Sequence, residues 1–204
     1  MVHISHQKIN RILISSFVER WQPETNTCMP YGEMTITLDD VDTLIGIPVV
    51  GRSVNPSTVD DLTILVMRIL GVTRRAAMDE LEQVRGTSVR LEWLRANFYC
   101  VADADTEAQI QSAARAYLLY LVGCTLFSDT SRTRVSTLYL KLFEDLGDVY
   151  RFACGTAAIA FLYRQLGYVF KAGVRHIAEY LPLLQVLLVF LPDLNNYYVY
   201  FAST

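Results

Sequence analysis

Apolar residues recur every three to four positions along most of this chain. The first such segment, residues 7–21, ends at Trp21, just before Pro23. This spacing is typical of amphipathic helices. The longer helices are predicted at residues 7–21, 57–71, 74–85, 88–98, 106–124, 134–146 and 149–166, with a last one starting at Lys171. We therefore predict a mainly α, multi-helix domain of about eight helices.

Residues 26–37 follow a different pattern. Pro30 and Gly32 indicate a turn. After them Met34 and Ile36 alternate with threonines. A period of two with β-branched residues favours strands. We expect a small β-hairpin near residues 26–37.

Local signals indicate where several helices begin and end. Thr37 and Asp40 have the spacing of a capping box that starts a short helix. Gly46 can provide its left-handed stop, and Pro48 prevents continuation. By the same chemistry Thr106 is expected to cap the longest helix, whose apolar stripe we place at Ile110, Ala114, Tyr117, Leu121 and Cys124.

Composition indicates a folded domain. The chain has 204 residues, of which 52% are hydrophobic and 19% charged, enough to form a core and too apolar for disorder. Its net charge is -3, which disfavours autonomous nucleic-acid binding because phosphate neutralisation provides much of that affinity. No apolar run approaches the roughly 18 residues of a membrane span.

Catalytic and metal-binding chemistry is not indicated. The four cysteines are far apart, without a C-x-x-C pair, and are expected to be free thiols in a reducing compartment. His3 and His6 would share a helical face, but a solvated chain end is favoured over a metal site. Asp39, Asp40 and Asp42 are interpreted as capping and surface residues. We expect no catalytic residue, no metal and no cofactor.

Two polar–aromatic clusters could bind a partner or stabilise the fold. Trp, Tyr and Arg are favoured interface anchors. In the first cluster we favour an internal role, with Trp21 buried and Arg20 paired with Glu24 or Glu33. The second, within residues 85–94, could bind an anion at a helix start, although Ser88 as a plain helix cap is favoured. The candidate partner or structural residues are Arg20, Trp21, Glu24, Tyr31, Gly32, Glu33, Arg90 and Trp93.

A helix-turn-helix is the alternative interpretation of residues 37–53. The motif would consist of a first helix, the turn at Gly46 and a second element starting near Val49. That element contains one basic residue, Arg52, and follows three aspartates. DNA recognition is therefore the less favoured function.

Four ordered blocks carry a family resemblance. They are Phe17–Gly51, Val84–Leu94, Ala113–Phe127 and Gly155–Gly167. Together they resemble the plant mobile domain family, the MAIN-like (maintenance-of-meristems-like) proteins. The resemblance ends near residue 185, so residues 1–185 are expected to be the N-terminal part of that domain. Residues 186–204 are expected to be a divergent, non-native C-terminal tail on a truncated copy.

The resemblance implies a function that the residue pattern does not. Such proteins are implied to be nuclear and linked to transposon silencing, genome stability and meristem development. We accordingly expect a non-enzymatic protein-interaction module without a membrane role. Its expected partners are nuclear proteins, including phosphatase-like or other plant mobile domain proteins. The family is sometimes labelled aminotransferase-like, but the three scattered lysines Lys8, Lys141 and Lys171 do not suggest a pyridoxal-phosphate site.

Overall fold

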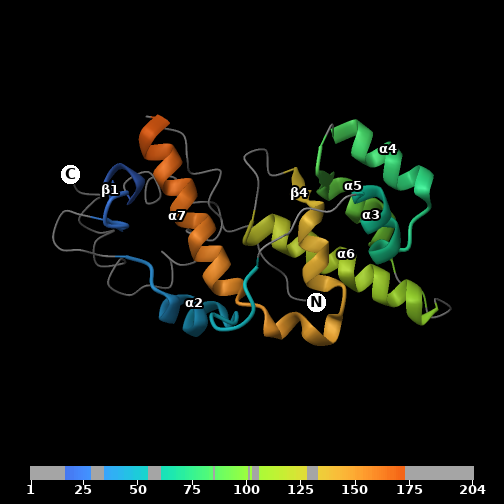
Figure 1. Cartoon of the computed structure of the whole chain (residues 1–204), viewed down its shortest axis with the longest axis horizontal. Coiled ribbons are helices and arrows are strands. Elements are labelled where there is room, and N and C mark those ends of the chain that lie inside the picture. The colour runs from blue at the N-terminus through green and yellow to red at the C-terminus, as the bar shows by residue number, and fades with distance from the viewer. Residues whose placement is uncertain are drawn as a thin grey trace. The chain divides into compact units, whose positions relative to one another are not determined.

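The described part of the chain is mainly helical, as predicted (Figure 1). A computed structural model describes residues 17–28, 35–54, 61–84, 86–100, 102, 106–127 and 133–172. The chain divides into two compact units. One joins Met1–Val49 to Gly155–Thr204, and the other is Val50–Cys154. His3, His6, Tyr31, Gly32, Glu33 and the tail 186–204 lie outside the described residues.

The first unit contains a small hairpin, displaced from its predicted place. Strand β1 (Trp21–Gln22) pairs antiparallel with β2 (Thr27–Cys28), with Trp21 opposite Cys28. The hairpin was expected near residues 26–37, but residues 35–37 lie outside any strand. Asn26 explains the shift, since its φ of 53° provides the left-handed turn residue that the sequence pattern had not identified. Trp21 is thus a strand residue and not the end of a helix.

Helix α2 (Leu38–Ile45) begins and ends as predicted. The Asp40 N–H donates to Thr37 Oγ1 at 3.2 Å, and the Thr37 N–H donates to Asp40 Oδ2 at 2.7 Å. Gly46, with φ of 67°, closes the helix. These contacts confirm the capping role of Asp40.

Helix α7 (Cys154–Ala172) packs closely on the segment that follows α2. The Gly155 N–H donates to the Pro48 carbonyl at 2.9 Å. A Cβ atom at Gly155 would lie only 2.9 Å from Val49 Cγ1 and 3.0 Å from the Ile47 carbonyl oxygen. Glycine is therefore required here by close approach.

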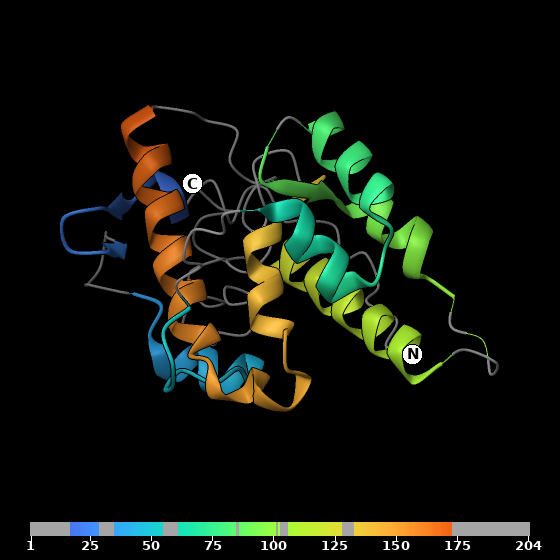
Figure 2. The same cartoon turned by 45° about the vertical axis from the view of Figure 1, so that its right-hand side comes forward.

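The second unit is built around helix α6 (Glu107–Thr125). Before it come α3 (Leu62–Leu70), α4 (Arg74–Val84), β3 (Ser88–Arg90) and α5 (Leu91–Phe98), and after it β4 (Arg134–Ser136) and the 3₁₀ helices η1 (Thr137–Phe143) and η2 (Leu146–Arg151). Helices α5 and α6 pack side by side (Figures 1 and 2). The core includes Leu65, Val66, Ile69, Leu70, Leu94, Ala116, Leu119 and Leu140.

Strands β3 and β4 pair antiparallel, with Val89 opposite Val135. Helix α6 crosses this pair at Gly123, where a Cβ atom would lie 2.6 Å from Val135 Cβ. The strand pair corrects two predicted helices. Residues 88–90 and 134–136 pair with each other across the sequence, a non-local interaction that helical spacing does not reveal.

Three other boundaries differ from the predictions. Ser88 does not cap α5, because the N-cap position is Arg90, without a side-chain cap bond. The helix predicted at 149–166 begins at Cys154. It runs on through Lys171, which therefore lies in the last turn of α7 and does not start a new helix. The helix predicted from residue 57 is α3, whose N-cap is Asp61: its Oδ1 accepts from the Thr63 N–H at 2.8 Å. The start predicted at Thr106 is confirmed, because Thr106 forms a capping box with Gln109.

The second helix of the proposed helix-turn-helix is not formed. Residues 46–54 are all described, and none of them is helical. Pro48 and the backbone bonds of this segment explain the result, because the Arg52 N–H donates to the Arg151 carbonyl at 2.7 Å. In the helices that the structure describes, none is long and apolar enough to cross a membrane.

Candidate partner-binding groove

Trp21 is a core residue of the first unit. It is fully buried, and its ring centroid lies 5.6 Å from that of Phe17 and 5.3 Å from that of Tyr163. The Tyr163 hydroxyl donates to the Ile36 carbonyl and lies 2.8 Å from Thr35 Oγ1. The expected burial of the Trp21 ring is thus confirmed. Glu24 is exposed and Arg20 half-buried, and the ion pair expected for Arg20 stays a prediction.

Arg90 also has a structural role. Its Nε lies 3.1 Å from both carboxylate oxygens of Glu80, and its Nη2 lies 2.6 Å from Oε2. The backbone N–H of Arg90 donates to Glu80 Oε1 at 2.8 Å. The Glu80 side chain is fully buried, and its hydrogen bond raises the pKa of Arg90 above the usual value. Glu80 therefore occupies the anion position expected near the start of α5, and it ties α4 to β3.

Glu80 is not among the residues predicted from the sequence, although the sequence contains a signal for it. Ala77, Glu80 and Val84 are the buried residues of α4 and stand at helical spacing. An acid within the apolar stripe of a helix indicates a buried ion pair. Trp93, the other residue of that cluster, is half-buried and packs edge-on against Phe98, with ring centroids 6.0 Å apart.

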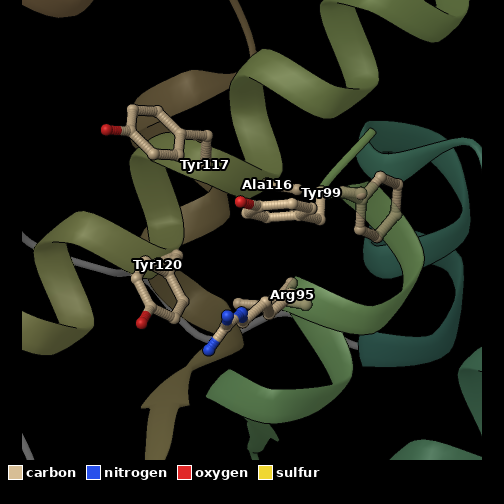
Figure 3. A pocket seen from close by; sticks show the side chains of 7 residues that line it. Arg95, Tyr99, Ala116, Tyr117 and Tyr120 are labelled. Carbon is tan, nitrogen blue, oxygen red and sulfur yellow. The ribbon is translucent and has the colours of Figure 1, made fainter. Parts of the chain in front are cut away.

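An aromatic groove lies between α5 and α6. Its volume is about 220 Å³. Figure 3 shows Arg95 and Tyr99 extending toward the α6 side, where Tyr117 and Tyr120 stand. Tyr99 is 65% exposed and Tyr117 is 60% exposed. The lining residues are Leu94, Arg95, Phe98, Tyr99, Ala116, Tyr117 and Tyr120.

The buried face of α6 differs from the predicted apolar stripe. Tyr117 was expected on the buried face, but the buried positions of this helix are Ala113, Ala116, Leu119 and Gly123. Apolar residues surround much of α6, so the spacing alone allows more than one buried face. The buried face of α6 is the one that carries Ala113, Ala116 and Gly123, because small residues let neighbouring elements approach closely. Tyr117 is consequently turned out of the core.

One cation lies beside the aromatic rings of the groove. The Arg95 guanidinium carbon is 5.5 Å from the Tyr99 ring centroid, a cation–π distance. No carboxylate among the described residues forms an ion pair with Arg95. The pKa of Tyr120 is raised, first by its interaction with Cys124 and then by burial, while Arg95 acts in the opposite direction. The groove thus offers phenol rings and one guanidinium to a ligand.

Known proteins match this chain over most of its length. The sequence model of the plant mobile domain family matches residues 1–190. The chain belongs to the plant mobile domain family. Protein MAIN-LIKE 1 of Arabidopsis thaliana is 42% identical over 186 residues, which cover 89% of this chain and 36% of that protein. No solved structure matches the chain.

Two further relatives from Arabidopsis thaliana extend the comparison. Protein MAINTENANCE OF MERISTEMS is 39% identical over 87% of this chain and 36% of its own length. A serine/threonine-protein phosphatase 7 long form homolog is 36% identical over 88% of this chain and 13% of its own length. The chain thus spans about a third or less of the length of these relatives.

Three of the described thiols of this plant mobile domain are buried or partly buried. Burial raises the pKa of Cys28 to about 11 and also raises the pKa values of Cys124 and Cys154. Since the thiolate is the reactive form, the raised pKa lowers the reactivity of these three thiols at neutral pH. Among the described residues no group of three or more potential metal ligands comes together.

Proposed function

We propose that this chain is a non-enzymatic protein-interaction module that binds a partner through the α5–α6 groove. The observation that carries the proposal is the exposure of Tyr99 and Tyr117 beside Arg95. Tyrosine and arginine are enriched among interface hot spots. Large aromatic faces left in water indicate a surface that another molecule covers.

The raised thiol pKa values favour the non-enzymatic role. Burial raises the pKa of Cys28, Cys124 and Cys154, which disfavours the thiolate that a nucleophilic cysteine requires. The DNA-binding alternative is weakened by the non-helical segment 46–54 and by the net charge of -3.

We further propose a nuclear location and a link to transposon silencing, genome stability and meristem development. Support comes from the family membership and from the name of the relative Protein MAINTENANCE OF MERISTEMS. Phosphatase-like and other plant mobile domain proteins are the proposed partners. The relative named as a phosphatase homolog, which contains a matching region within a much longer chain, supports this choice.

A quantitative pull-down from plant nuclear extract tests the proposal. The bait is the full chain, compared with Tyr117→Ala and with Tyr168→Ala as a matched control. Tyr168 is 67% exposed on α7 and belongs to the other unit. We expect specific nuclear proteins to be retained by the wild type and by Tyr168→Ala and lost with Tyr117→Ala. Equal recovery by all three baits would contradict a role for the groove.

A further inference from the structure

We propose that the α5–α6 groove binds an extended, proline-rich segment of a partner protein that carries an acidic residue. This inference rests on the proposed function and names the chemistry of its ligand. The groove itself identifies that chemistry through three properties: its rings, its single cation and its size.

The rings suit proline in an extended chain. Proline-rich segments adopt the polyproline II conformation, which has no internal hydrogen bonds and leaves its carbonyls available. Such segments bind in aromatic-lined grooves, where proline rings pack against aromatic faces. Here Tyr99, directly after α5, and Tyr117 and Tyr120 of α6 provide the faces. Their hydroxyls can donate to the ligand carbonyls.

The single cation selects for an acidic residue. Arg95 has no carboxylate partner among the described residues and stands at the edge of the rings. A guanidinium binds a carboxylate through directed, charge-assisted hydrogen bonds. The same charge repels a methylated lysine, which would otherwise suit an aromatic cage.

Other ligand classes fit this groove less well. Single-stranded nucleic acid also stacks on aromatic rings, but its backbone requires a positively charged track. Arg95 is the one cation among the residues that line the groove, and the net charge of the chain is -3. The volume of about 220 Å³ is below the roughly 300–1,000 Å³ of small-molecule sites. That space suits a few side chains of a bound peptide.

Fluorescence anisotropy with labelled synthetic peptides tests the inference. The probe is a short proline-rich peptide with one central glutamate. One matched peptide replaces the prolines with alanine, and another replaces the glutamate with glutamine. The full chain should bind the probe saturably, and the alanine peptide should bind at least about tenfold more weakly, which corresponds to about 1.4 kcal/mol.

Three variants assign the binding to the groove. Tyr117→Ala should weaken binding of both proline peptides by at least about tenfold. Arg95→Gln should remove the preference for glutamate over glutamine and leave binding of the glutamine peptide unchanged. Tyr168→Ala should bind like the wild type. Circular dichroism confirms that each variant is folded.

Several outcomes would overturn the inference. These are the absence of saturable binding to the probe, equal binding of the alanine peptide, or a loss of affinity with Tyr168→Ala as large as that with Tyr117→Ala. Tighter, Tyr117-dependent binding of a labelled single-stranded oligonucleotide would assign the groove to nucleic acid instead. If the peptides fail while the pull-down still depends on Tyr117, the proposed function stands and only the ligand chemistry is wrong.

Discussion

Two aromatic clusters of this chain differ sharply in their exposure to water. Phe17, Trp21 and Tyr163 form the first, within one unit, where Trp21 is 0% exposed. Tyr99, Tyr117 and Tyr120 belong to the second, within the other unit, where Tyr117 is 60% exposed. The residue types are similar, so composition alone does not separate a core cluster from a solvent-exposed one.

The Tyr163 hydroxyl and the Arg95 guanidinium also differ in their partners. In the first, the Tyr163 hydroxyl donates to the Ile36 carbonyl, so its polar atom is satisfied inside the unit. In the second, the cation of Arg95 has no acid partner among the described residues. A cluster with internal partners stabilises the fold, whereas one that displays an uncompensated charge and exposed rings is suited to a ligand.

The largest expected effect comes from Trp21→Ala. Removing this buried ring should lower the free energy of unfolding by about 3–5 kcal/mol. Urea denaturation followed by circular dichroism measures the change. Trp21→Phe is the control and should be milder, because it keeps an aromatic ring and removes an N–H that has no acceptor in the described structure. A variant that unfolds like the wild type would place Trp21 among the binding residues.

Substitution of Arg90 and of Arg95 should change the stability of the chain by different amounts. Arg90→Ala leaves the buried Glu80 carboxylate without its partner and should destabilise the chain by about 3 kcal/mol. Arg95→Ala removes a side chain without an ion pair and should change stability by no more than about 0.5 kcal/mol. Both values come from the same urea titrations. Equal effects of the two substitutions would show that Arg95 also stabilises the fold.

Removing one hydroxyl from each aromatic cluster also compares the buried cluster with the exposed one, and the expected changes in stability are smaller. Tyr163→Phe loses a partly buried hydrogen bond and should reduce the free energy of unfolding by about 1 kcal/mol. Tyr117→Phe should leave stability unchanged within about 0.5 kcal/mol. Thermal denaturation of both variants provides the measurement. A larger effect from Tyr117→Phe would indicate an internal partner for that hydroxyl.

Thiol alkylation compares the groove and the hairpin without any amino-acid substitution. Cys100, exposed and one residue after Tyr99, should react with iodoacetamide first. Cys28, buried in the hairpin with a pKa of about 11, should react slowly at neutral pH and faster as the pH rises toward 11. Mass spectrometry after timed quenching follows each site. Early modification of Cys28 would mean that the hairpin opens readily.

Much of the local structure could be predicted from neighbouring residues. The capping box at Thr37 and Asp40, the stop at Gly46 and the cap at Thr106 were all correct. Each depends on hydrogen bonds within one helical turn, so residues a few positions apart contain the necessary information. The predicted position of the hairpin was wrong because the left-handed turn residue Asn26 was not recognised in the sequence.

Other features depended on residues far apart in the sequence. Ser88–Arg90 forms a strand only because it pairs with Arg134–Ser136. The orientation of α6 was likewise undetermined, since apolar residues on several sides allowed Tyr117 to be assigned to the core. Neither result follows from local propensity, because tertiary packing overrides it.

The sequence by itself determined the helical class, the family and several helix ends, since periodicity, ordered blocks and caps are local properties. The tertiary structure alone decided that Arg90 is committed to buried Glu80 and that Tyr117 faces solvent beside Arg95. The physical reason is that burial and charge pairing depend on neighbours from other elements. Those neighbours distinguish a residue that stabilises this domain from one that is available to a partner.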